Sequence, residues 1–128
     1  MAVMRQLAKP TPRRRRIPSP QPVVVITGGT TGIGRAIADV LDARGYRVMV
    51  CSRAAKTASL PRAFVHASCD VRERDAVRRL VEATVTRFGR LDVMVNCAGV
   101  SRWRALEDID EAFVRDVIDT AVLGTLWG

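Results

Sequence analysis

Short apolar runs alternate with segments of helical periodicity from residue 23 onward. Between the runs, apolar side chains recur three or four positions apart, which predicts amphipathic helices. The short runs are rich in β-branched residues, as is typical of strands in a buried parallel sheet. The predicted strands are Val23–Thr27, Arg47–Cys51, Ala63–Ala67 and Leu91–Val95. The predicted helices cover residues 33–41, 72–88 and 106–122, with Gly45 and Gly89 ending the first two.

Strands that alternate with helices predict the fold class. This order is typical of an α/β protein with a Rossmann-type, doubly wound parallel sheet and helices on both faces. The chain stops where a fifth strand would begin, so we expect a sheet truncated after about four strands. The last strand of such a sheet forms an open edge that is apolar on both faces. The apolar segment Ala121–Trp127 also has little to pack against. We therefore expect marginal stability or self-association.

The charge is unevenly distributed along the chain. Residues 1–22 contain five prolines and six basic residues, Arg13–Arg16 among them, and no acid. This composition predicts a disordered basic arm. Residues 23–128, the predicted NAD(P)-binding domain, carry 15 basic and 13 acidic side chains. Since the folded part is nearly neutral, a nucleic-acid-binding core is not expected.

Other bulk features narrow the function class. No apolar run approaches the ~18 residues that a membrane helix needs, and the N-terminus has no apolar signal region. We therefore expect a cytoplasmic protein without a membrane partner. The three cysteines, Cys51, Cys69 and Cys97, show no metal-binding spacing and are expected to be free thiols.

A glycine-rich turn follows the first strand and opens the first helix. The residues are Thr27–Gly34, with the sequence TGGTTGIG. The N-terminus of a helix offers unpaired N–H groups and a partial positive charge to an anion. A pyrophosphate can reach them only where no side chain intervenes, and we expect Gly28 and Gly32 to provide that clearance. Gly34 is expected to let the helix pack closely on the strand.

Two further motifs follow later strands. Asp70-Val71 comes after the third strand, and Asn96-Cys97-Ala98-Gly99 ends the fourth. Together with the TGxxxGxG turn, this order resembles the short-chain dehydrogenase/reductase family. The resemblance covers residues 23 to about 128. It implies that Asp70 hydrogen-bonds the adenine ring of a dinucleotide, and that the Asn96 motif steadies the sheet and borders the cofactor.

The end of the second strand predicts the choice of cofactor. NAD sites place an acid there for the ribose, whereas NADP sites need a cation for the 2′-phosphate. Ser52 stands where the family has its acid, and Arg53 follows it. Arginine can bind a phosphate through two parallel hydrogen bonds, and Arg35 is a candidate assistant. We therefore expect NADP rather than NAD. The candidate cofactor-binding residues are Thr27, Gly28, Thr30, Thr31, Gly32, Ile33, Gly34, Ser52, Arg53, Asp70, Val71, Asn96, Ala98 and Gly99.

The family's catalytic residues have no counterpart in these 128 residues. Relatives of this kind use a Ser, and a Tyr followed four residues later by a Lys. The only tyrosine, Tyr46, is followed at that distance by Val50. The family also has an asparagine at the position of Ala121, where it kinks a helix and supports a proton-relay water; Ala121 cannot do so. The only histidine, His66, has no expected partner.

Three functions are therefore considered. The first is an NADP(H)-dependent oxidoreductase of this family, of which the chain is a fragment that binds the dinucleotide but cannot catalyse. The second is a non-catalytic dinucleotide-binding or regulatory module that acts with a partner chain. The third is a nucleic-acid binder that uses the basic arm, which the lack of interleaved aromatic residues makes the weakest.

Overall fold

The computed structural model describes residues 20–54, 60–100 and 102–128, so nearly all of the expected basic arm lies outside the described residues. Four described strands form one parallel sheet in the order β3-β2-β1-β4. They are β1 (Val23–Thr27), β2 (Arg47–Ser52), β3 (Val65–Ser68) and β4 (Val93–Asn96). The helices are α1 (Gly32–Ala43), α2 (Arg74–Phe88), α3 (Glu111–Ile118) and α4 (Gly124–Trp127), with a 3₁₀ turn η1 (Leu106–Asp108) and a π-helical turn η2 (Asp119–Leu123).

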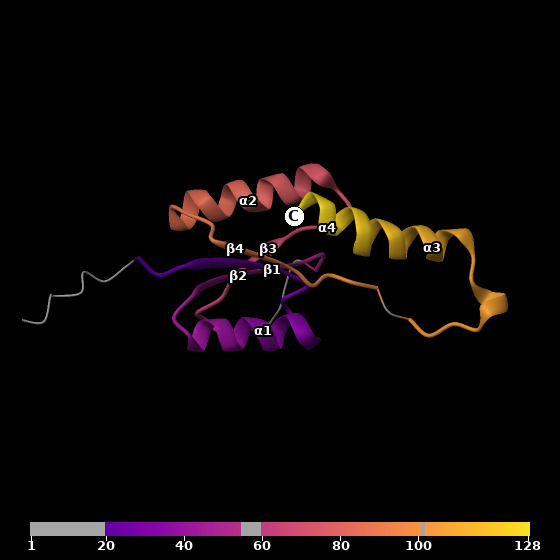
Figure 1. Cartoon of the computed structure of the whole chain (residues 1–128), viewed down its shortest axis with the longest axis horizontal. Coiled ribbons are helices and arrows are strands. Elements are labelled where there is room, and N and C mark those ends of the chain that lie inside the picture. Colours follow the sequence, from indigo (N-terminus) through magenta and orange to yellow (C-terminus); the bar gives the residue numbers. More distant parts are fainter. Residues whose placement is uncertain (1–19, 55–59, 101) are drawn as a thin grey trace, which may run out of the picture.

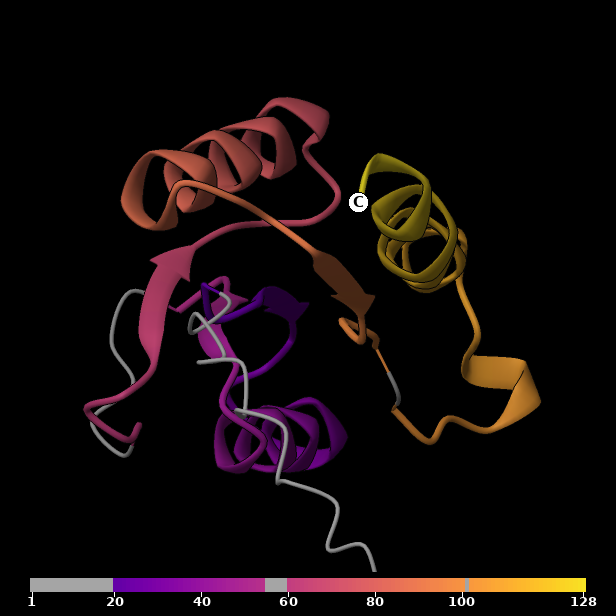
Figure 2. The same cartoon turned by 60° about the vertical axis from the view of Figure 1, so that its left-hand side comes forward.

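The helices cover both faces of the sheet. Figure 1 shows α1 on one face, and α2 together with α3 and α4 on the other. Figure 2 shows the segment α3–α4 alongside β4 and the N-terminal end of α2. The expected α/β fold with a doubly wound parallel sheet is confirmed. The chain runs outward from β1 to β2 and β3, and then returns to place β4 on the other side of β1. Open α/β sheets bind ligands at such a point of reversal, at the carboxyl ends of the strands.

Burial on both faces explains why β1 is apolar throughout. Alternate residues of a strand point to opposite faces, so a strand covered on both sides needs apolar residues at every position. Val25 lies in the core beneath α2, and its neighbours Val24 and Ile26 lie in the core beneath α1. All five residues of β1 are buried. The other buried residues of these two cores are Met49, Cys51, Cys69, Val71, Val77 and Leu80 on the α2 face, and Ala38, Val48, Val50 and Phe64 on the α1 face.

Several element boundaries differ from the sequence-based predictions. The third strand begins at Val65 rather than Ala63, because the Phe64 amide donates to Pro61 O within a turn. The fourth strand is Val93–Asn96, since its pairing with β1 begins at Val93. The helix expected from residue 72 begins at Arg74, because Arg72 and its amide are used to bind Asp70 instead.

The expected helix over residues 106–122 is interrupted twice. Its regular part begins only at Glu111, where Asp110 caps it by accepting a hydrogen bond from the Phe113 amide (2.7 Å). It then widens into the π-helical turn Asp119–Leu123, although Ala121 stands at the family's asparagine position. The helix is therefore distorted here without an asparagine, while the expectation that Ala121 cannot support a proton-relay water stays a prediction. The Thr125 hydroxyl donates to Ala121 O (2.8 Å), which satisfies a carbonyl in the widened turn.

The segment α3–α4 keeps apolar side chains at the surface. Val122 is 50% exposed and Leu126 is 69% exposed. Within residues 20–54, 60–100 and 102–128, no helix has the length and apolar character needed to cross a membrane. This exposed apolar surface matches the expected lack of packing for residues 121–127, while self-association stays a prediction.

Candidate functional site: a hollow at the carboxyl end of the sheet

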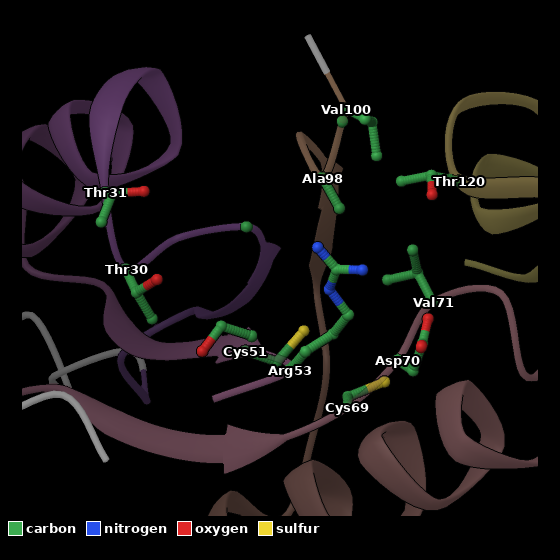
Figure 3. A pocket seen from close by; sticks show the side chains of 13 residues that line it. Thr30, Thr31, Cys51, Arg53, Cys69, Asp70, Val71, Ala98, Val100 and Thr120 are labelled. Atoms are coloured by element: carbon green, nitrogen blue, oxygen red, sulfur yellow. The ribbon is translucent and has the colours of Figure 1, made fainter. Parts of the chain in front are cut away.

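A hollow of about 170 Å³ lies at the carboxyl ends of the four strands. Its lining residues come from every strand end and from η2. They are Gly28, Thr30, Thr31, Cys51, Ser52, Arg53, Cys69, Asp70, Val71, Ala98, Gly99, Val100 and Thr120. Figure 3 shows the Arg53 side chain reaching into the middle of this hollow, between Ala98 and the pair Asp70 and Val71. The hollow is the candidate site.

Two glycines of the turn permit close backbone packing. Gly28 has a φ of +66°, and a Cβ there would lie 2.9 Å from the Cα of Ala98. A Cβ on Gly34 would lie 2.5 Å from the carbonyl oxygen of Gly28. Gly34 therefore brings the helix close to the turn itself, and not to the strand as the sequence suggested. Gly28 lines the hollow, so its missing side chain serves the packing against Ala98 as well as access.

Gly32 has a different reason to be glycine. Its φ is +55°, a conformation that side chains other than glycine rarely adopt, and nothing lies within 4 Å of where its Cβ would be. Gly32 begins α1, and Thr31, the residue before it, does not cap the helix with its side chain. The first N–H groups of α1 thus lack a side-chain acceptor and an intrahelical partner. An anion has open access to them.

The Thr27 hydroxyl ties the end of β1 to the turn after β4. It accepts hydrogen bonds from the backbone amides of Cys97 and Ala98, both at 3.1 Å, and donates to Val95 O at 3.5 Å. Thr27 is 1% exposed. Thr27 is therefore a structural link beneath the hollow, and its side chain is not among the lining residues.

Ser52 and Arg53 stand where β2 ends. The Ser52 hydroxyl lies 3.0 Å from His66 Nε2 on β3 and also contacts Ala54 O at 3.4 Å. The expectation that nothing pairs with His66 is therefore wrong, because the parallel register places Ser52 beside β3. Arg53 makes no ion pair within the described part of the chain. Arg35, the expected assistant, binds Asp39 at 3.0 Å and does not line the hollow.

Asp70 is held by a neighbour that the sequence analysis overlooked. Arg72 donates from Nε to both carboxylate oxygens, from Nη2 to Oδ2 (2.6 Å), and from its amide to Oδ1 (3.1 Å). These hydrogen bonds lower the pKa of Asp70 below its usual value, and burial opposes them only in part. The other side of the Arg72 guanidinium binds Asp116 on α3 at 2.7 Å. The spacing Asp-x-Arg was the available signal for this arrangement.

Two thiols border the hollow between β2 and β3. Cys51 and Cys69 are both buried and both are free. Hydrogen bonding to Cys69, together with burial, raises the pKa of the Cys51 thiol far above its usual value. Cys51 is therefore a neutral group at neutral pH. The expectation of free cysteines near the core is met for these two described residues.

Other candidates lie around the hollow rather than in it. Asn96 donates through Nδ2 to Thr125 O (3.4 Å) and so connects β4 with α4. Ile33 is 75% exposed at the start of α1. Thr120, which sequence reasoning missed, is 7% exposed and lines the hollow from η2. No local pattern marks Thr120, because the docking of α3–α4 alone brings it to this wall.

The residues present fit a phosphate-bearing dinucleotide. The open N–H groups at the start of α1 and the free space at Gly32 suit a pyrophosphate. Arg53, which has no ion pair among residues 20–54, 60–100 and 102–128, suits a further phosphate. The described hollow is smaller than the ~300–1,000 Å³ of typical ligand pockets, so it suits one part of an extended molecule. The fold and the site thus define a Rossmann-type domain with a ligand site at its switch point.

The comparison with protein families agrees with this class. The model of the short chain dehydrogenase family matches residues 22–128. The chain belongs to this family, which confirms the resemblance found in the sequence. Members of this family bind NAD(P), and the family is one of oxidoreductases.

Three similar proteins show how much of each relative the chain covers. A Streptomyces violaceoruber protein, described as a ketoacyl reductase of the granaticin polyketide synthase, is 40% identical over 114 residues, which are 81% of this chain and 45% of that protein. Ipsdienol dehydrogenase of Ips pini is 34% identical and covers 80% of this chain and 44% of its own length. Among solved structures, actinorhodin polyketide ketoreductase carrying F189W, with NADPH, has a TM-score of 0.75 at 34% identity, covering 83% of this chain and 44% of that one. The chain thus spans less than half the length of these relatives.

Proposed function

We propose that this chain binds NADP(H) and forms the cofactor-binding part of an NADP(H)-dependent oxidoreductase. The observation that carries the proposal is Arg53, which reaches into the hollow at the end of β2, where an NAD site needs an acid. Arg53 makes no ion pair with any residue that the structure describes. The similar polyketide ketoreductase with NADPH supports this choice of cofactor. When bound, NADP(H) supplies or accepts a hydride.

In this proposal, different residues bind different parts of the cofactor. The start of α1 and Gly32 receive the pyrophosphate, and Arg53 with Ser52 receives the 2′-phosphate of the adenosine ribose. Asp70 and Val71 border the adenine, and Ala98 and Gly99 border the opposite side of the hollow. Within these 128 residues no Tyr precedes a Lys by four positions, so we expect binding without turnover for this chain alone. The free thiols are consistent with a cytoplasmic location.

The first test compares the two reduced cofactors. NADPH and NADH are titrated separately into the purified chain, with nicotinamide fluorescence as the signal. We expect saturable binding with a preference for NADPH. Arg53→Ala should weaken NADPH binding by about tenfold or more and leave NADH binding nearly unchanged, since one charged hydrogen-bonded contact is lost. Arg62→Ala, at the opposite end of the sheet, removes the same charge and should alter neither affinity. Equal losses for both cofactors in Arg53→Ala would refute the cofactor assignment.

The second test addresses the pyrophosphate. Gly32→Val places a branched side chain in the open space at the start of α1 and should abolish binding of both cofactors. Gly45→Val is the matched control, because Gly45 also has a positive φ (+86°) and open space but follows the C-terminal end of α1. Both variants carry a similar backbone strain of about 1–2 kcal/mol. Retained NADPH binding in Gly32→Val would place the dinucleotide elsewhere.

A second candidate function is a non-catalytic dinucleotide-binding module that pairs with another chain or a second copy. The exposed apolar side chains of α3–α4 favour it. Sedimentation over a range of concentrations would detect self-association. We expect Leu126→Glu to abolish association and keep NADPH binding, because Leu126 is 69% exposed and does not line the hollow. A monomer at all concentrations that also binds no purified relative's C-terminal half would eliminate this candidate.

A further inference from the structure

A carboxylate stands close to the phosphate-binding arginine. Asp70 and Arg53 both line the hollow, and Figure 3 shows both side chains directed into it. After the hydrogen bonds from Arg72, the positive charge of Arg53 is a further influence that lowers the pKa of Asp70, so the two groups lie within each other's field. An acid so placed competes with a phosphate for the same guanidinium.

Arg72 occupies most of the hydrogen-bonding capacity of that carboxylate. Asp70 Oδ1 accepts from the Arg72 amide (3.1 Å) and Nε (3.0 Å), and Oδ2 accepts from Nε (3.1 Å) and Nη2 (2.6 Å). A carboxylate offers about four acceptor positions. Three N–H groups of Arg72, with the Nε–H shared between the two oxygens, take up most of these positions. Arg53 makes no ion pair with Asp70 in the described part of the chain.

The position of Arg72 is also fixed by an ion pair with a residue of α3. Its Nη1 binds Asp116 Oδ1 on α3 at 2.7 Å. The side chains of Asp70 and Asp116 are only 26% and 22% exposed, so these ion pairs are shielded better than pairs on the open surface. Because Arg72 is anchored to two elements, it cannot swing away from Asp70 without breaking its pair with α3.

We propose that Arg72 is a specificity-determining positioning residue, which keeps Asp70 from pairing with Arg53 and so leaves Arg53 available to the 2′-phosphate. The inference rests on the proposed function, in which Arg53 receives that phosphate. Arg72 contacts no part of the cofactor in this scheme. It acts by pairing with the carboxylate of Asp70. This pairing neutralises an acid that would otherwise compete with the phosphate for Arg53.

The experiment measures the NADPH preference, defined as the ratio of the dissociation constants for NADH and NADPH. Arg72→Ala releases Asp70 to pair with Arg53, so we expect the preference to fall by about fivefold or more, the size of one partly shielded charge contact. Adding Asp70→Asn to Arg72→Ala should restore the preference. A purely structural role of Arg72 would weaken both cofactors alike, and Asp70→Asn would not then restore the ratio.

The controls separate this inference from the proposed function. Arg78→Ala on α2, which breaks the exposed pairs with Asp75 and Glu82, should leave the preference unchanged. If Arg53→Ala alone removes no preference, the proposed function itself fails. If Arg53→Ala removes it but Arg72→Ala does not, only the role of Arg72 is overturned.

A further pair of variants covers the case in which Arg72→Ala does not fold. Asp70→Asn and Asp70→Asn with Arg72→Gln are compared after circular dichroism has shown that both are folded. Because residue 70 then carries no charge, the change at residue 72 should leave the preference within about twofold. A further fall of fivefold in the double variant would overturn the inference, since Arg72 would then act without Asp70.

Discussion

Replacing Thr27 by valine removes the hydroxyl that ties β1 to the turn after β4, while the shape of the side chain is kept. In the native chain this oxygen accepts from the amides of Cys97 and Ala98, both at 3.1 Å. Thr27 is 1% exposed, so a valine leaves two amides facing an apolar methyl group. The same turn packs on Gly28, where a Cβ would approach the Cα of Ala98 to 2.9 Å.

The magnitude follows from those two amides. Leaving a buried donor without an acceptor costs about 1–3 kcal/mol. Both amides are partly buried, which favours the lower half of that range and gives a loss of about 2–4 kcal/mol in the free energy of unfolding. Domains are stabilised by only about 5–15 kcal/mol in total, so the variant should lose a large part of its stability.

Urea unfolding followed by far-ultraviolet circular dichroism measures this loss. With a slope of about 1–3 kcal/mol per molar urea, the midpoint should fall by about 1 M or more. Thr27→Ser keeps the hydroxyl and should retain most of the stability, whereas Thr31→Val, in the same turn but without a side-chain cap, should change it by less than about 0.5 kcal/mol. A loss below about 0.5 kcal/mol in Thr27→Val would refute the reasoning, because the amides would then have another acceptor.

Two further predictions concern close packing and charge. Gly34→Ala should lower the free energy of unfolding by about 1–3 kcal/mol in the same urea assay, despite the better helix propensity of alanine, because its Cβ would meet the carbonyl oxygen of Gly28; a more stable variant would contradict this. Asp92 accepts from the Val23 amide at 2.8 Å, and its hydrogen bonds with Arg90 and Val23 lower its pKa. The depressed pKa stabilises the fold above the unfolded value of about 3.9, and this effect is lost as the pH falls through the folded pKa. Asp92→Asn should therefore lower the melting temperature at pH 7 and converge with the wild type once the pH has fallen below the folded pKa of Asp92. An equal difference at both pH values would rule out the charge as its cause.

The sequence by itself determined the fold class and the place of the candidate site. Apolar runs such as Val23–Thr27 are fully buried only in a sheet that is covered on both faces, so their alternation with helices was enough to indicate a doubly wound sheet. The glycine turn and Arg53 each follow a strand directly, and the carboxyl ends of parallel strands share one edge. Local order along the chain therefore placed them at a common hollow.

Only the tertiary structure decided which side chains are engaged and which are free. The contact of Asp70 with adenine stays a prediction, whereas the structure shows that its carboxylate binds Arg72. Arg72 is held in turn by Asp116, forty-four residues further along the chain. Thr120 reaches the hollow because Gly124 packs on Val71 and α3–α4 docks beside it. Ion pairs and helix docking join residues that are distant in the sequence, and no local periodicity encodes the choice between two possible partners for the same charge.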